Sequence, residues 1–155
     1  MTENEQLITN FYTAFGHNDI KKMAECYHEN IQFEDPAFGI LNNKKPIIMW
    51  KMLLERSKGN IKIEFFDVVA NENSGSATWV ATYVFSKTNR KVINKINAKF
   101  EFQDGLIIKH TDSFDIYKWS KQALGLKGFL LGWTSFMRNK IQESAKKSLE
   151  NYIKN

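Results

Sequence analysis

LIIKHTDSFDIYKW, residues 106–119, alternates between apolar and polar side chains in the way that a half-buried β-strand does. The more apolar face of such a strand carries Leu106, Ile108, His110, Asp112, Phe114 and Ile116. Because an apolar face points inward, His110 and Asp112 are predicted to be buried. Burying an ionisable pair costs on the order of several kcal/mol unless the two groups bond each other or line a wet cavity. The stretch therefore predicts a pocket with a polar floor.

Three more strands are predicted ahead of this one, over residues 61–70, 77–85 and 92–102. Side chains in the second and third of them again alternate between two faces. Asp104-Gly105 is a strong hairpin signal that leads into the final strand. Together the four strands predict an antiparallel meander.

The N-terminal part of the chain has the spacing of helices. Thr2 is the predicted cap of a first helix, and a short second helix follows over residues 20–27. A strand is predicted over 30–34, a loop over 35–39 and a third helix over 43–57. The fold class is therefore α+β, with helices ahead of an antiparallel sheet.

The chain is long enough for one domain with a real core, and its 14% aromatic content is high. Such an excess fits an apolar ligand cavity, a large core or a dimer interface. The single cysteine, Cys26, excludes an intramolecular disulfide and lies in an apolar segment, so inert burial is expected. No signal peptide or membrane-spanning run is recognised, which predicts a cytoplasmic protein.

The positive charge is confined to the C-terminal segment. Residues 1–119 hold 15 Lys and Arg against 15 Asp and Glu, whereas residues 120–155 hold 7 against 2. This distribution argues against a nucleic-acid surface over the whole domain. We divide the chain into a cavity domain, 1–119, and a basic amphipathic helical extension, 120–155. Packing of the extension on the domain or a partner is favoured over peripheral membrane contact.

The loop FEDPAFG, residues 33–39, and the stretch HTDSFDIYKW, residues 110–119, resemble the SnoaL-like branch of the nuclear-transport-factor-2-like superfamily, as does the order of elements. The resemblance covers residues 1–119. It implies a cone-shaped fold in which a curved antiparallel sheet, wrapped by N-terminal helices, encloses an apolar cavity. It also implies a homodimer and a small hydrophobic ligand. Members include ketosteroid isomerases, polyketide cyclases, limonene epoxide hydrolases and binding modules without catalysis, so the fold leaves the function open.

The resemblance also suggests roles for single residues. The ketosteroid isomerase loop places Asp35 at the position of the general base, although Asp-Pro is equally a turn-former. The two oxyanion donors of that enzyme fall on Phe11 and Ala98, neither of which can donate. The polyketide cyclases are similar in having a pocket histidine and aspartate, which suggests acid–base chemistry by His110 and Asp112.

Limonene epoxide hydrolases use an Asp–Arg–Asp set, for which Arg56, at a helix end, and Arg90, in a turn, are poor matches. Scattered histidines give no metal motif, and the sequence contains neither a Gly-rich phosphate loop nor a nucleophile elbow. We expect no metal and no cofactor. The predicted lining residues of the cavity are Tyr27, Trp50, Trp79, Tyr83, Asn94, Phe100 and Phe114. Two hypotheses follow: an isomerase, cyclase or hydrolase that needs no cofactor, or a binding or protein-interaction module.

Overall fold

The structure is a computed structural model that describes residues 1–155. Its helices are α1 (Glu3–Gly16), α2 (Ile20–Cys26), α3 (Lys45–Ser57), α4 (Ile116–Leu124), α5 (Leu126–Leu131) and α6 (Ser135–Lys154). Its strands are β1 (Tyr27–Asp35), β2 (Gly39–Asn42), β3 (Lys62–Ala70), β4 (Ser74–Phe85), β5 (Arg90–Gln103) and β6 (Leu106–Ser113).

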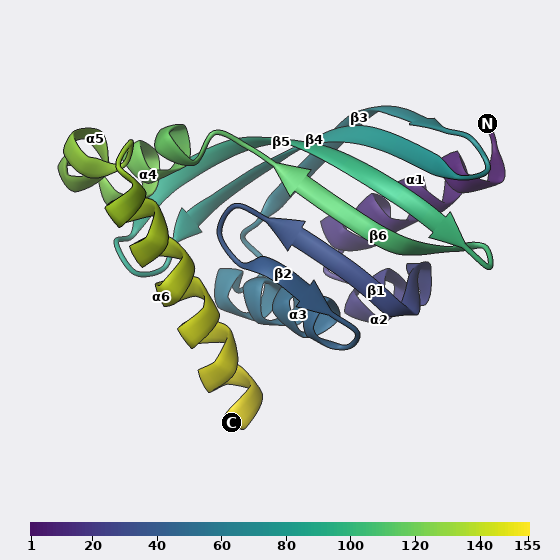
Figure 1. The fold of residues 1–155 in the computed structure, drawn as a ribbon, viewed down its shortest axis with the longest axis horizontal. Coiled ribbons are helices and arrows are strands. Elements are labelled where there is room, and N and C mark those ends of the chain that lie inside the picture. Colours follow the sequence, from purple (N-terminus) through teal and green to yellow (C-terminus); the bar gives the residue numbers. More distant parts are fainter.

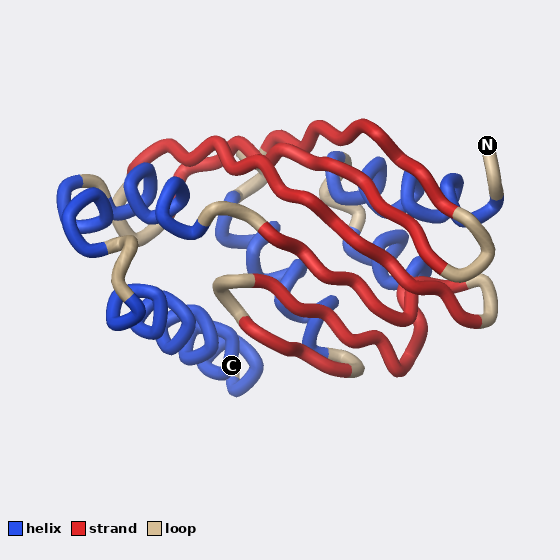
Figure 2. Tube along the Cα trace, turned by 45° about the horizontal axis from the view of Figure 1, so that its top comes forward, coloured by secondary structure: helices blue, strands red, loops and turns tan.

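The six strands form one curved, unclosed sheet in the order β2-β1-β6-β5-β4-β3 (Figure 2). Strands β3 to β6 are the predicted antiparallel meander, and the β1–β6 pair is parallel. Helices α1 to α3 lie together on one side of the sheet, α4 and α5 at one end of it, and α6 runs away from that end (Figure 1). The α+β fold with an added C-terminal helical segment is confirmed.

Local signals in the sequence account for several element ends. The Thr2 side chain accepts a hydrogen bond from the Glu5 amide and caps α1, and Asp19 caps α2 in the same way. Asp104 and Gly105 both have positive φ, as a tight two-residue hairpin between β5 and β6 requires. Thr2 and Asp19 thus each satisfy a backbone amide that the start of a helix leaves without a partner.

Two predicted elements are corrected. The strand expected over 106–119 ends at Ser113, because the Asp115 carboxylate accepts from two amides and caps α4, which begins at Ile116. The loop expected through Gly39 instead turns into β2, which pairs with β1. Gly39 has a φ of +68°, a conformation that a glycine adopts without strain, and so it can close this hairpin.

The main core lies between the sheet and α1 to α3 and also includes Leu149 of α6. A second, smaller cluster joins Val92 of β5 to α4 and α6. The predicted boundary between residues 119 and 120 lies within α4, and the division into two domains stays a prediction.

Candidate functional site

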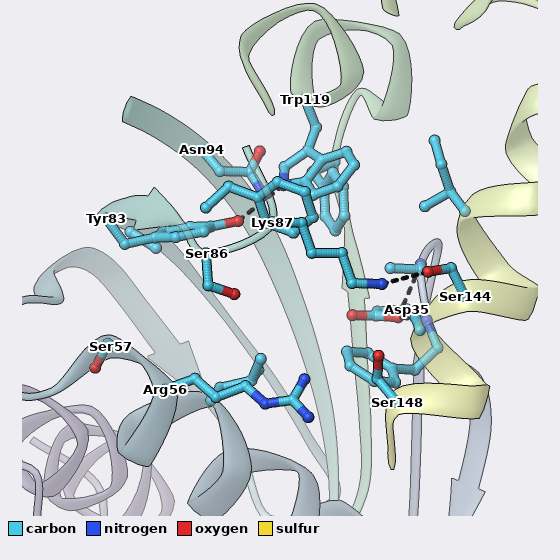
Figure 3. Close-up of a pocket in the computed structure, with 18 of the residues that line it drawn as sticks. Asp35, Arg56, Ser57, Tyr83, Ser86, Lys87, Asn94, Trp119, Ser144 and Ser148 are labelled. Carbon is cyan, nitrogen blue, oxygen red and sulfur yellow. Dashed lines mark hydrogen bonds between the residues drawn. The ribbon is translucent and has the colours of Figure 1, made fainter. Parts of the chain in front are cut away.

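A cavity of about 420 Å³ lies between the sheet, α3 and α6, within the range typical of small-ligand pockets. Figure 3 shows side chains from these three walls pointing into it. The lining includes Asp35, Trp50, Arg56, Trp79, Tyr83, Lys87, Asn94, Asp112, Phe114, Trp119, Lys127, Met137, Lys140, Ile141, Ser144 and Ser148. Most of the lining residues are apolar, so the few polar groups define where a ligand would be oriented.

Asp112 of β6 places a buried carboxylate on the cavity wall. Its Oδ1 atom lies 2.9 Å from His110 Nε2 and accepts a hydrogen bond of 3.3 Å from Trp79 Nε1. Its Oδ2 atom accepts no hydrogen bond from the protein, and this oxygen is not fully buried. One oxygen of Asp112 is therefore fixed by the protein, while the other is available to a ligand.

A chain of buried hydrogen bonds holds His110. Trp50 Nε1 donates to the Tyr27 hydroxyl at 3.0 Å, and that hydroxyl lies 2.7 Å from His110 Nδ1. Because an indole nitrogen only donates, the Tyr27 oxygen accepts from Trp50 and its proton can go to Nδ1. His110 then carries its proton on Nε2 and donates it to Asp112. Burial also raises the pKa of Tyr27 well above its ordinary value, so this hydroxyl stays a donor.

His110 is fully buried and does not line the cavity. The rings of Phe11, Phe33 and Phe100 pack around it, with centroid distances of 5.6, 5.1 and 4.6 Å. The sequence parity that predicted burial of His110 and Asp112 is confirmed. The surrounding rings fix the imidazole in place, so it can orient Asp112 without touching a ligand.

Asp35 is the second acid on the cavity wall. Its Oδ1 atom accepts from the amides of Ala37 and Phe38, so the turn role predicted for Asp-Pro is present together with a place at the cavity. Burial raises the pKa of Asp35 from 3.8 to about 7, the two amide bonds oppose that rise, and the nearby charge of Asp112 adds to it. This carboxyl can therefore take up or release a proton near neutral pH.

The neighbouring strands β4 and β5 contribute two further polar groups. The Tyr83 hydroxyl accepts a hydrogen bond of 2.8 Å from Trp119 Nε1, which leaves its own proton free to donate. The side chain of Asn94 makes no hydrogen bond within the protein, although the residue is buried. Figure 3 shows both groups on one side of the cavity. They are donors placed toward the space that a ligand would fill.

Helix α6 forms the remaining wall, which sequence reasoning did not place. Lys87, in the turn between β4 and β5, donates to Ser144 of α6 at 2.5 Å (Figure 3). Gln142 of α6 donates to the Pro36 carbonyl at 3.0 Å. The apolar stripe of α6 was visible in the sequence, but its spacing could not say which surface it would cover. Arg56, set aside as a helix-end residue, also lines the cavity.

The structure brings most of the predicted site residues together. Those on the cavity wall are Asp35, Trp50, Trp79, Tyr83, Asn94, Asp112 and Phe114. His110, Tyr27 and Phe100 lie behind the wall, in the core, because they pack against one another and against α1. No three His, Cys, Asp or Glu side chains converge in residues 1–155 as ligands of a metal would. The catalytic and binding roles of all these residues stay predictions.

Comparison with protein families finds that the model of the SnoaL-like domain matches residues 8–110. Comparison with curated proteins finds no match.

Three solved structures illustrate the likeness of fold. A proposed polyketide cyclase from Xanthomonas campestris pv. campestris is 18% identical, with a TM-score of 0.62 over 77% of this chain and 96% of its own. A LEH-like epoxide hydrolase from M. tuberculosis is 20% identical, with a TM-score of 0.62 over 83% and 95%. TerC, co-crystallised with polyporic acid, is 12% identical, with a TM-score of 0.67 over 78% and 98%. At these identities the likeness extends to the fold alone.

Proposed function

This chain belongs to the SnoaL-like domain family, and on that premise we propose that it binds a small apolar molecule in its cavity and transforms it by acid–base chemistry. The observation that carries the proposal is the pair of acids on the cavity wall. Asp35 has a pKa of about 7, and Asp112 is oriented by a buried chain of hydrogen bonds. A base is most effective when its pKa lies near the working pH, and a positioned group of this kind contributes a rate factor of about 10² to 10⁴.

The chemistry we propose is proton transfer at a carbon next to a carbonyl group. The Asp35 carboxylate takes the proton, and the C–H electron pair moves into the carbonyl group to form an enolate. Asp35 then returns the proton to a different carbon, which completes an isomerisation. Alternatively, the enolate carbon attacks a second carbonyl of the same molecule and closes a ring, and Asp35 gives its proton to the alkoxide oxygen that this attack forms. Neither route requires a bound cofactor.

Negative charge develops on the enolate oxygen, and Asn94 and Tyr83 are the groups we assign to it. Their free N–H and O–H donors come from adjacent strands and face the cavity. Such donors usually supply the largest single contribution to catalysis of this type. They stand in for the donors that Phe11 and Ala98 cannot provide. Asp112 Oδ2 would accept a hydrogen bond from the same ligand and fix its orientation.

Thermal-shift measurements test the proposal. The ligands are steroids, polyketide-like aromatic ketones, terpene epoxides and fatty acids, each with wild type and Asp112→Asn. A ligand that binds only the folded state raises its stability in proportion to log concentration once it exceeds its dissociation constant. We expect one of the four ligand classes to stabilise the wild-type protein, and to stabilise Asp112→Asn less. Stabilisation that is equal in both proteins, with no change in the ligand, would favour the alternative of a binding module.

A further inference from the structure

Helix α5 and the start of α6 lie together at one end of the molecule (Figure 1). This end exposes an unusual number of large apolar side chains. These residues, here called the apolar tip, are between 42% and 73% exposed. They are Leu126, Phe129, Leu130, Leu131, Trp133 and Phe136. A cluster of this kind on a small domain marks an interaction surface.

The packing of α5 on α4 directs the apolar side chains of α5 outward. A Cβ atom on Gly128 would lie 1.9 Å from the carbonyl oxygen of Ser120, and one on Gly132 would lie 2.1 Å from the Ser120 hydroxyl. A residue larger than glycine therefore does not fit at these two positions, where α5 and its C-terminal end pack on α4. The apolar side chains of this short helix have only the outer face available, so their exposure is built into the fold.

The charged residues within the segment that carries the apolar tip have one sign. Residues 116–142 contain five cations and no acidic residue. The five are Lys118, Lys121, Lys127, Arg138 and Lys140. Arg138 donates to the Trp133 carbonyl at 2.8 Å, and Lys140 lies 4.9 Å from the centre of the Phe136 ring, so two of the cations are held beside exposed aromatic residues.

We propose that the apolar tip docks on the surface of a bilayer that contains anionic lipids. Exposed aromatic and leucine side chains flanked by lysine and arginine fit the headgroup boundary, where apolar groups insert and cations meet lipid phosphates. None of the helices has the length and hydropathy of a membrane span. A second copy of the chain fits less well, because a two-fold contact through this tip would bring five cations against five.

The apolar tip also adjoins the cavity. Lys127 of α5 and Met137 and Lys140 of α6 line the cavity, and the exposed residues Leu126 and Phe136 are their neighbours in the chain. Docking would therefore bring one wall of the cavity close to the apolar interior of the bilayer, where apolar molecules dissolve. This last step rests on the proposed function, whereas the docking itself does not.

Vesicle binding followed by the emission of Trp133 tests the docking. Trp133 is 64% exposed, whereas Trp50, Trp79 and Trp119 are buried, so a blue shift on adding vesicles reports on the tip. We expect the shift with an equal mixture of phosphatidylglycerol and phosphatidylcholine. Binding to phosphatidylcholine alone should be weaker by more than tenfold, since each cation near the surface contributes about fivefold.

The test variant is Phe129→Ser with Leu130→Ser, which should weaken binding to the anionic vesicles by at least about tenfold. The matched control is Val69→Ser with Ile93→Ser, two comparably exposed residues on the sheet, which should leave binding unchanged. Equal loss in both variants, equal binding to both vesicle types, or no binding to the anionic vesicles would each overturn the proposal. Concentration-dependent dimerisation through the tip in place of vesicle binding would identify a second copy of the chain as its partner. Vesicle binding without any cavity ligand would still support docking if the proposed function failed.

Discussion

Replacing Asp35 with Asn should stabilise the protein at alkaline pH and have little effect at acid pH. Burial gives the folded protein a pKa of about 7 at Asp35, against 3.8 as the ordinary value of the unfolded chain. Between pH 3.8 and about 7, folding is therefore accompanied by the uptake of a proton at Asp35. The stability that comes from protonated Asp35 is fully present below about pH 4 and is lost as the pH rises to about 7.

The full shift corresponds to a ceiling of about 4 kcal/mol in the free energy of unfolding. We expect about half of this, because the cavity gives the carboxylate partial access to water. Asparagine keeps an Oδ1 acceptor for the Ala37 and Phe38 amides, so the turn survives the change. Urea unfolding of wild type and Asp35→Asn at pH of about 4.5 and about 8.5 measures the effect.

The stabilisation by Asp35→Asn should increase by about 2 kcal/mol from the lower pH to the higher. The matched control is Asp115→Asn, because Asp115 also binds two backbone amides through Oδ1 but is exposed at the cap of α4. Its effect should change little between the two pH values. An effect of Asp35→Asn that is equally independent of pH would refute the reasoning that burial perturbs this carboxyl.

Three further experiments, two substitutions and one chemical reaction, test the interior of the protein. Tyr27→Phe deprives Trp50 and His110 of a buried partner, so it should lower the free energy of unfolding by about 1–3 kcal/mol, and urea unfolding would show an unchanged midpoint if that chain were unimportant. Tyr12→Phe should be neutral or stabilising by up to about 1 kcal/mol in the same assay, since the Tyr12 hydroxyl is buried without a partner and a clear loss would reveal one. Cys26 should react with a thiol reagent only as the protein unfolds, because burial raises the pKa of its thiol to about 11; rapid reaction of the native protein would contradict this.

The sequence predicted the sheet and the burial of the polar pair on β6 well, because alternation is a local signal. The parity of His110 and Asp112 predicted their burial, and Thr2 marked the start of the first helix. The same alternation continues in the sequence beyond the end of β6, because the aspartate that caps α4, Asp115, falls where a strand would also have a polar residue. The homodimer and the cytoplasmic location remain predictions.

The parts of the site that could not be predicted depend on contacts between distant segments. The stripe of α6 indicated an amphipathic helix, but its place over the cavity depends on bonds such as that between Lys87 and Ser144. Tyr27 and Phe100 were predicted to line the cavity because aromatic side chains are common in ligand pockets, but both pack around His110 instead. A pattern within one element does not distinguish a cavity wall from the layer behind it.

The most direct test of acid–base chemistry in the cavity is hydrogen–deuterium exchange at carbon. Aromatic ketones with C–H bonds next to the carbonyl group are incubated with the protein in deuterated water and followed by proton NMR, which detects proton abstraction whatever the final product. We predict exchange that depends on protein concentration for at least one ketone, reduced by about 10² or more in Asp35→Asn and reduced also in Asp112→Asn. Exchange at the same rate in all three proteins, or at the rate of buffer alone for a ketone that demonstrably binds, would contradict the account.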